Sequence, residues 1–100
     1  MITLLRKKPT LTDEEFAKYW LEMHAPLAKT IPDLRRYVVN VVKRPPNKEP
    51  DFNGAVELWF DDVASMKKAF SSPAGVATMK DTEKFTASVI TMYIDEHIIM

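Results

Sequence analysis

The sequence contains no cysteine and only two glycines among its 100 residues. Without cysteine it cannot form a disulfide framework, a thiolate zinc site or an iron–sulfur cluster. With only Gly54 and Gly75 it has no glycine-rich loop of the kind that cradles phosphates, which argues against a tightly bound nucleotide. Its two histidines, His24 and His97, lie far apart and give no metal-ligand spacing. We therefore expect no metal and no cofactor.

The chain also lacks an excess of charge of either sign and any long hydrophobic run. Fourteen Lys and Arg balance fourteen Asp and Glu, which argues against a nucleic-acid partner. No apolar run approaches the roughly 20 residues of a membrane span, and basic residues follow the apolar N-terminal stretch rather than preceding it as in a signal peptide. Apolar residues nevertheless make up 46% of the chain, too many for a disordered tail. We expect residues 1–100 to form a single soluble, cytoplasmic domain without a membrane partner.

A helix is predicted from the capping box at Thr12 to about Lys29. Thr12 and Glu15 have the spacing at which each side chain hydrogen-bonds the backbone amide of the other. Apolar residues then recur at three- and four-residue steps and predict a buried helix face, formed by Phe16, Tyr19, Trp20, Met23 and Leu27. A second helix is predicted from Asp61 or Asp62 to about Glu83, with a break and a new cap at Ser72-Pro73.

Four strands are predicted around these helices, at residues 2–8, 34–44, 54–60 and 86–97. The resulting order, βαββαβ, predicts an α+β, ferredoxin-like antiparallel sheet with both helices on one face. Aliphatic residues occupy both faces of the later strands, although a sheet face turned to water should be polar. We expect two sheets to pack face to face in a homodimer; the alternative is irregular strand composition in a monomer.

The residue pattern resembles the EthD family, named for ethyl tert-butyl ether degradation. The resemblance rests on Phe16-x-x-x-Trp20-x-x-x-His24-Ala25-Pro26-Leu27 and on Ile31-Pro32-Asp33-Leu34-Arg35-Arg36-Tyr37-Val38-Val39-Asn40. It covers essentially the whole chain. It implies a dimeric α+β barrel whose subunits each hold a small-molecule pocket between sheet and helices. It says little about chemistry, because this fold superfamily carries many different reactions.

His24 is the leading candidate for a catalytic residue. It lies four residues after Trp20, which itself lies four after Phe16, so the three would share one helix face and line one cavity. An imidazole suits proton transfer near neutral pH, and the resemblance places the family's histidine here. The alternative is a structural histidine near a helix C-terminus, held by the dipole or by a carbonyl near Pro26.

The other candidates are weaker and each has a structural alternative. With Phe16 and Trp20, Tyr37 and Trp59 are predicted to position the ligand. Tyr37 would donate a hydrogen bond to it or fill the core, and Trp59 would form a wall of the pocket or belong to the core and the subunit interface. His97 would share a strand face with Tyr93 and Asp95, or simply lie at a solvated strand end or a subunit contact.

Two functions from different classes fit this pattern. The first is an EthD-like enzyme that oxidises, isomerises or dehydrates a small apolar organic molecule without a cofactor, with His24 as the acid–base group. The second is a non-catalytic module that binds such a molecule. A purely structural dimer with a filled core would have no pocket at all.

Overall fold

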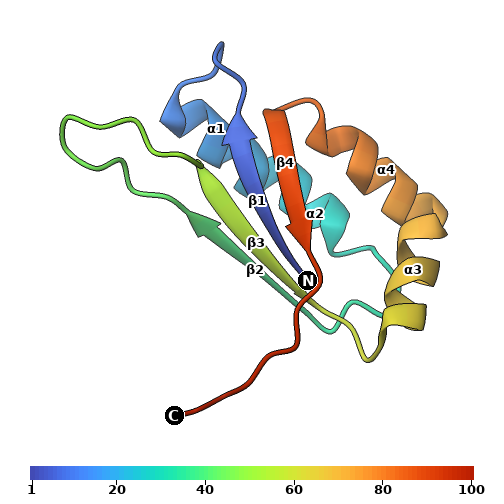
Figure 1. Ribbon diagram of the computed structural model, residues 1–100. Helices are drawn as coiled ribbons and strands as arrows, with labels where there is room; N and C mark the ends of the chain where they lie inside the picture. Colours follow the sequence, from blue (N-terminus) through green and yellow to red (C-terminus); the bar gives the residue numbers. More distant parts are fainter.

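The computed structural model describes residues 1–100 and contains the predicted βαββαβ order (Figure 1). Its four strands form one sheet in the order β2-β3-β1-β4, and every neighbouring pair is antiparallel. All the helices lie on one face of this sheet (Figure 1). The strands are β1 (Ile2–Lys7), β2 (Arg36–Val41), β3 (Gly54–Trp59) and β4 (Thr86–Met92). The α+β, ferredoxin-like fold is therefore confirmed.

The first helical segment runs from Asp13 to Ala28 in three consecutive parts. These are α1 (Asp13–Tyr19), a π-helical turn η1 (Trp20–His24) and α2 (Ala25–Ala28). The capping box is present, with Thr12 accepting from the Glu15 amide at 3.1 Å and Glu15 accepting from the Thr12 amide at 2.9 Å. In η1 the Ala25 amide donates to the Trp20 carbonyl five residues back. Pro26 follows directly, and its ring would clash with the Glu22 carbonyl in a regular α-helix, so a wider turn accommodates it.

The second helical segment breaks where the sequence predicted. Helix α3 (Val63–Ser71) begins at Asp62, whose side chain accepts from the Ser65 amide at 2.7 Å. Helix α4 (Pro73–Thr82) begins at Ser72, with proline at the first helical position. Gly75 permits this sharp junction, because a Cβ there would lie 2.3 Å from the Ala69 carbonyl oxygen.

The core lies between the helices and the covered face of the sheet. Alternate residues of β3 are buried, so Val56 and Leu58 point toward the helices. With four other buried side chains they form one cluster: Leu5, Phe16, Trp20 and Phe85. The Trp20 ring lies against Gly54, where a Cβ would come within 2.1 Å of it. The absence of a side chain at Gly54 thus leaves the space in which Trp20, the largest buried side chain, packs against the sheet.

The other face of the sheet has no helix on it (Figure 1). Strand register places every second residue here, and most of these side chains are apolar: Ile2, Leu4, Val38, Ala55, Trp59, Ile90 and Met92. Ile90 is 45% exposed and Met92 is 41% exposed. The prediction that both sheet faces are apolar is therefore confirmed.

The last strand is shorter than predicted. It ends at Met92 rather than at residue 97, and residues 93–100 extend away from the body without regular structure (Figure 1). The reason lies in pairing: β4 hydrogen-bonds only to β1, and Met92 is opposite Ile2, the first residue of β1. Beyond Met92 there is no partner strand to pair with. The strand at 34–44 is likewise shortened to Arg36–Val41.

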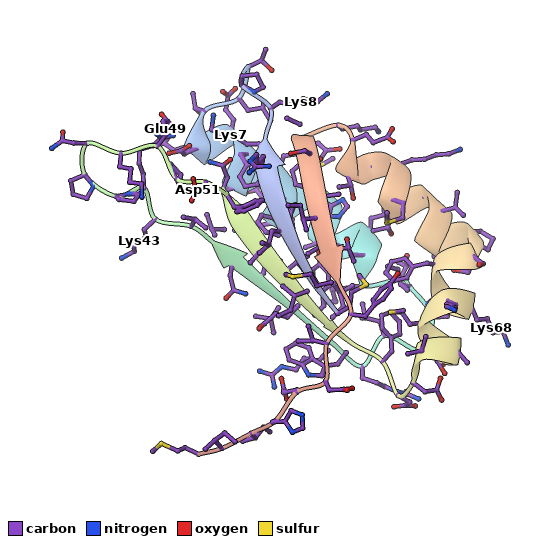
Figure 2. The ribbon with its side chains drawn as sticks, in the orientation of Figure 1. Lys7, Lys8, Lys43, Glu49, Asp51 and Lys68 are labelled. Carbon is purple, nitrogen blue, oxygen red and sulfur yellow. The ribbon has the colours of Figure 1, made fainter.

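Charged side chains gather away from the core. Figure 2 shows Lys7, Lys8, Lys43, Glu49 and Asp51 at one end of the sheet, around the loop that joins β2 to β3. It also shows Lys68 projecting outward from α3. None of the helices combines the length and the apolar composition that a membrane-spanning helix needs.

Candidate functional site

A cavity of about 520 Å³ lies between the helices and the covered face of the sheet. Thirteen of its twenty lining residues are hydrophobic, and its walls come from all four strands and the helices. A volume of this size suits a small organic ligand, and an apolar lining with few polar groups is typical of such sites. The structure therefore contradicts the possibility of a purely structural dimer with a filled core and no pocket.

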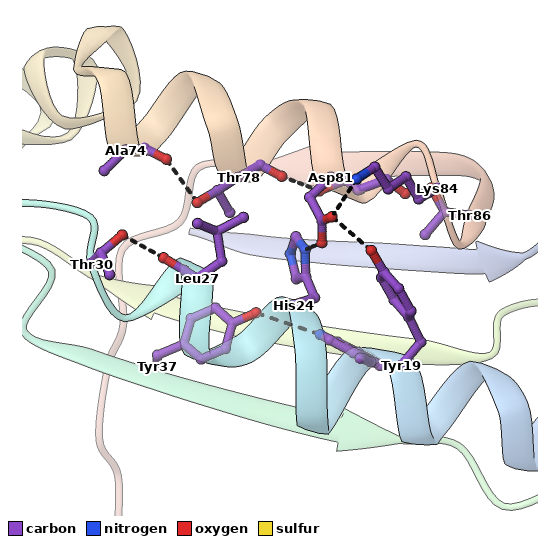
Figure 3. Close-up of polar contacts among 12 residues, drawn as sticks. Tyr19, His24, Leu27, Thr30, Tyr37, Ala74, Thr78, Asp81, Lys84 and Thr86 are labelled. Atoms are coloured by element: carbon purple, nitrogen blue, oxygen red, sulfur yellow. Dashed lines mark hydrogen bonds and ion pairs between the residues drawn. The ribbon is translucent and has the colours of Figure 1, made fainter.

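His24 lines this cavity and is only 5% exposed. Its Nδ1 atom lies 2.8 Å from Oδ2 of Asp81, which α4 carries toward the first helical segment (Figure 3). No buried side-chain nitrogen or oxygen lacks a hydrogen-bond partner. Since Nε2 of His24 has no partner in the protein, it must be reachable from the cavity. The imidazole is thus held at one nitrogen and presented to a ligand at the other.

Asp81 is itself held by two further groups. The Tyr19 hydroxyl donates to Oδ1 at 2.7 Å, and Nζ of Lys84 lies 3.6 Å from the same oxygen (Figure 3). Burial raises the pKa of the Asp81 carboxyl, but the hydrogen bonds from Tyr19 and His24 and the nearby positive charge of Lys84 act together against burial and hold the pKa below its usual range. The hydrogen bond to Asp81 in turn raises the pKa of Tyr19 to about 12. Asp81 therefore stays an anion, able only to accept hydrogen bonds.

The environment of His24 keeps its imidazole neutral at neutral pH. Burial lowers the pKa of His24, and the hydrogen bond and charge of Asp81 oppose this shift without reversing it. Because Asp81 only accepts, the ring proton of neutral His24 belongs on Nδ1. The lone pair is then on Nε2, facing the cavity, which is the arrangement of a general base oriented by a carboxylate.

Tyr37 brings a second polar group to the cavity. Its hydroxyl lies 3.4 Å from Nε1 of Trp20, which is fully buried (Figure 3). Burial raises the pKa of the Tyr37 phenol, and the Trp20 bond opposes that shift only in part. The phenol therefore keeps its proton at neutral pH.

Of the residues predicted for the site, three line the cavity and two do not. Trp20, His24 and Tyr37 line it. Phe16 is buried behind it, with its ring centroid 5.4 Å from that of Trp20. Trp59 lies on the open face of the sheet, beneath the guanidinium of Arg36 at 4.9 Å, because odd and even positions of β3 point to opposite faces. Phe16 and Trp59 therefore do not contact a ligand in this cavity.

The predicted position of His97 on a strand face was wrong. Its shared face with Tyr93 and Asp95 required a strand, but all three follow the end of β4, and His97 is exposed. The predicted inward position of Met23 was also wrong, since Met23 is 62% exposed. The π-helical turn adds one residue to the helical repeat, so His24 takes the inward place that a regular helix would give to Met23.

Two residues of the site were not identified from the sequence. Tyr19 was predicted on the buried helix face but not as a hydrogen-bond partner, and Asp81 was not identified at all. Asp81 shares one face of α4 with Gly75 and Thr78, at three-residue spacing, and all three are buried. The sequence offered one signal for the buried face of α4: Gly75, because a glycine in a helix often marks a close contact. No group of three His, Cys, Asp or Glu side chains is placed to bind a metal ion.

A family model described as the EthD domain matches residues 8–88 of the chain. The chain belongs to the EthD family. An EthD family protein from Bacillus halodurans is similar to it at 30% identity over 97% of this chain and 96% of that one, with a TM-score of 0.77. No curated protein matches.

More distant structures share the fold of this EthD family member. The Arabidopsis thaliana protein At3g17210 has 14% identity and a TM-score of 0.75, over 99% of this chain and 96% of that one. SnoaB, a cofactor-independent oxygenase from Streptomyces nogalater, has 12% identity and a TM-score of 0.57, over 94% and 91%. At these identities the similarity shows the fold and leaves the reaction open.

Proposed function

We propose that this EthD family member is an enzyme that removes a proton from a small apolar organic substrate bound in the cavity, without a cofactor. The observation that carries the proposal is the orientation of His24: Asp81 holds Nδ1 at 2.8 Å, and Nε2 faces an apolar cavity. A carboxylate behind an imidazole fixes its tautomer and stabilises the imidazolium that forms on proton uptake. Trp20 and Tyr37 position the ligand.

Proton abstraction is the step shared by isomerisation, dehydration and the cofactor-independent oxidation of an activated carbon acid. SnoaB, a cofactor-independent oxygenase, shares this fold, which supports oxidation as the reaction that follows proton removal. The polar set Tyr19–Asp81–His24 supports proton transfer in all three, because a buried and oriented titratable group is typical of catalytic sites.

The unit that functions is, in this proposal, a homodimer joined through the open faces of the two sheets. An uncovered face with seven apolar side chains is larger than isolated surface residues explain. Two ferredoxin-like proteins of similar fold, from Bacteroides fragilis and Thermobifida fusca, are described as dimeric, which supports the same assembly here.

The test compares the wild type with His24→Gln, a substitution that keeps a polar side chain of similar reach. Small ketones, phenols and alcohols are screened for conversion by mass spectrometry and for oxygen uptake, and for displacement of the neutral dye Nile red from the cavity. We expect at least one compound to be converted, with the rate falling about 10²–10⁴-fold in His24→Gln, as for loss of a general base. Displacement of Nile red should change little.

The alternative is a non-catalytic module that binds a small molecule, which the apolar lining alone would allow. It predicts compounds that displace Nile red equally from both proteins while none is converted. That result would contradict the enzyme.

A further inference from the structure

His24 and Tyr37 both line the cavity, and they have fixed and opposite hydrogen-bonding roles toward a ligand. At His24 the role follows from Asp81, which as an anion can only accept. Nδ1 must therefore donate to Asp81, and Nε2 is left as an acceptor. His24 contributes a lone pair to the cavity and no proton.

At Tyr37 the role follows from Trp20. The indole N–H is a donor only, it is fully buried, and its hydrogen-bond partner is the Tyr37 hydroxyl oxygen. That oxygen must therefore accept from Trp20, and its own proton points elsewhere. No protein acceptor receives this proton, and Tyr37 lines the cavity. Tyr37 thus contributes a proton to a ligand, the reverse of His24.

Most other polar groups of the lining are already paired within the protein. The Thr78 and Thr82 hydroxyls donate to carbonyls of their own helix at 2.8 and 3.0 Å. Thr3 and Thr91 bond to each other at 3.0 Å. Lys67 and Tyr93 belong to the exposed rim. One hydroxyl proton of the Thr3–Thr91 pair also remains free, on the β1–β4 side. Beside the first helical segment, His24 supplies an acceptor and Tyr37 a donor.

His24 lies on η1 and Tyr37 on β2, and Trp20 connects the two groups. Trp20 and His24 begin and end the π-helical turn, so their side chains share its inner face, about one helical turn apart. The Trp20 indole N–H reaches the Tyr37 hydroxyl, and Tyr37 and His24 line the same cavity.

From this pairing we propose the substrate class: a neutral, enolisable carbonyl compound, whose acidic C–H faces Nε2 of His24 and whose carbonyl oxygen accepts from Tyr37. This inference rests on the proposed function. In the step, the C–H bond breaks and its proton forms an N–H bond on Nε2. The electron pair moves into a carbon–carbon double bond, and the carbonyl π pair moves to the oxygen. The Tyr37 O–H stabilises that enolate oxygen.

Other ligand classes match the site less well. A simple alcohol or phenol can donate to His24 and accept from Tyr37 through the same oxygen, but it offers no acidic C–H beside a carbonyl for His24 to remove. An anionic ligand would be repelled by Asp81, which lies directly behind His24. The positive charge that forms on His24 during proton abstraction is, by contrast, favoured by that carboxylate.

The first experiment measures proton exchange in 2-tetralone, a two-ring ketone with an acidic C–H beside its carbonyl. Deuterium uptake at C1 in D₂O is followed by proton NMR, with protein and without it. We expect the protein to accelerate uptake, His24→Gln to lose about 10²–10⁴-fold of that acceleration, and Tyr37→Phe to lose about tenfold or more. Uptake no faster than in buffer, or equal in wild type and His24→Gln, overturns the proposed substrate class.

The second experiment measures binding without turnover. The affinity of 2-tetralone is compared with that of tetralin, the same skeleton without the carbonyl. One neutral hydrogen bond predicts a preference for the ketone of about fivefold in the wild type, reduced to none in Tyr37→Phe. A preference that survives in Tyr37→Phe assigns the carbonyl to another group and overturns the role of Tyr37.

The two proposals fail in distinguishable ways. Conversion of an alcohol or phenol that depends on His24, without exchange in 2-tetralone, leaves the proposed function standing and removes the substrate class. Binding without any conversion removes both.

Discussion

The two faces of the sheet are built from alternate residues of the same strands, yet they differ in what covers them and in what chemistry they carry. On the covered face, Trp20 lies against the Gly54 backbone, and the helices enclose a cavity with His24 at its wall. On the open face, Trp59, Ile90 and Met92 remain accessible in the single chain. Apolar content alone does not separate the faces. The helices decide which face encloses a cavity and which face stays uncovered (Figure 1).

The largest expected effect comes from removing one tryptophan on each face. Trp20→Ala should lower the free energy of unfolding by about 3–5 kcal/mol, because it empties a fully buried position. Trp59→Ala should cost less, and its cost should grow with protein concentration, because it weakens a dimer and spares the core. Urea unfolding at several protein concentrations distinguishes the two. Equal, concentration-independent losses would contradict the difference between the faces.

A smaller effect is expected from a charge placed on the open face. We expect the wild type to have a solution mass of twice 11.5 kDa by light scattering. Ile90→Lys should weaken dimerisation at least tenfold, about 1.4 kcal/mol, because it buries an unpaired ammonium.

Val63→Lys is the matched control, since Val63 is 56% exposed but lies on α3 rather than on the sheet. Its mass should equal that of the wild type. A wild-type mass of 11.5 kDa, or equal effects of the two lysines, would contradict an interface on the open face.

The fold was predictable because its signals are local. The Thr12 capping box, the Ser72-Pro73 break and the order of strands and helices are written in short stretches of sequence, and each is present. The end of β4 was not predictable, because it depends on where the neighbouring strand β1 begins. The alternating residues beyond Met92 predicted more strand, but β1 has no residues opposite them to form the pairs.

The site was predictable in part. His24, Trp20 and Tyr37 were identified from their spacing and the family pattern, and all three line the cavity. Asp81 was not found, because it lies 57 positions from His24 and meets it only through helix packing. Trp59 was assigned to the wrong face, since an apolar pattern on both faces does not tell which side the helices cover.

Nitrogen-15 NMR of labelled imidazoles shows whether His24 presents a lone pair on Nε2 to the cavity while its proton lies on Nδ1, next to Asp81. Because burial lowers the pKa of His24, we expect the ring to be neutral at pH 7.5, with its proton on Nδ1, and to gain a proton only below the usual pH for imidazole. Asp81→Asn should loosen this preference, and His97→Gln, in the exposed tail, should leave the His24 signals unchanged. A proton on Nε2, or an imidazolium at pH 7.5, would contradict the account.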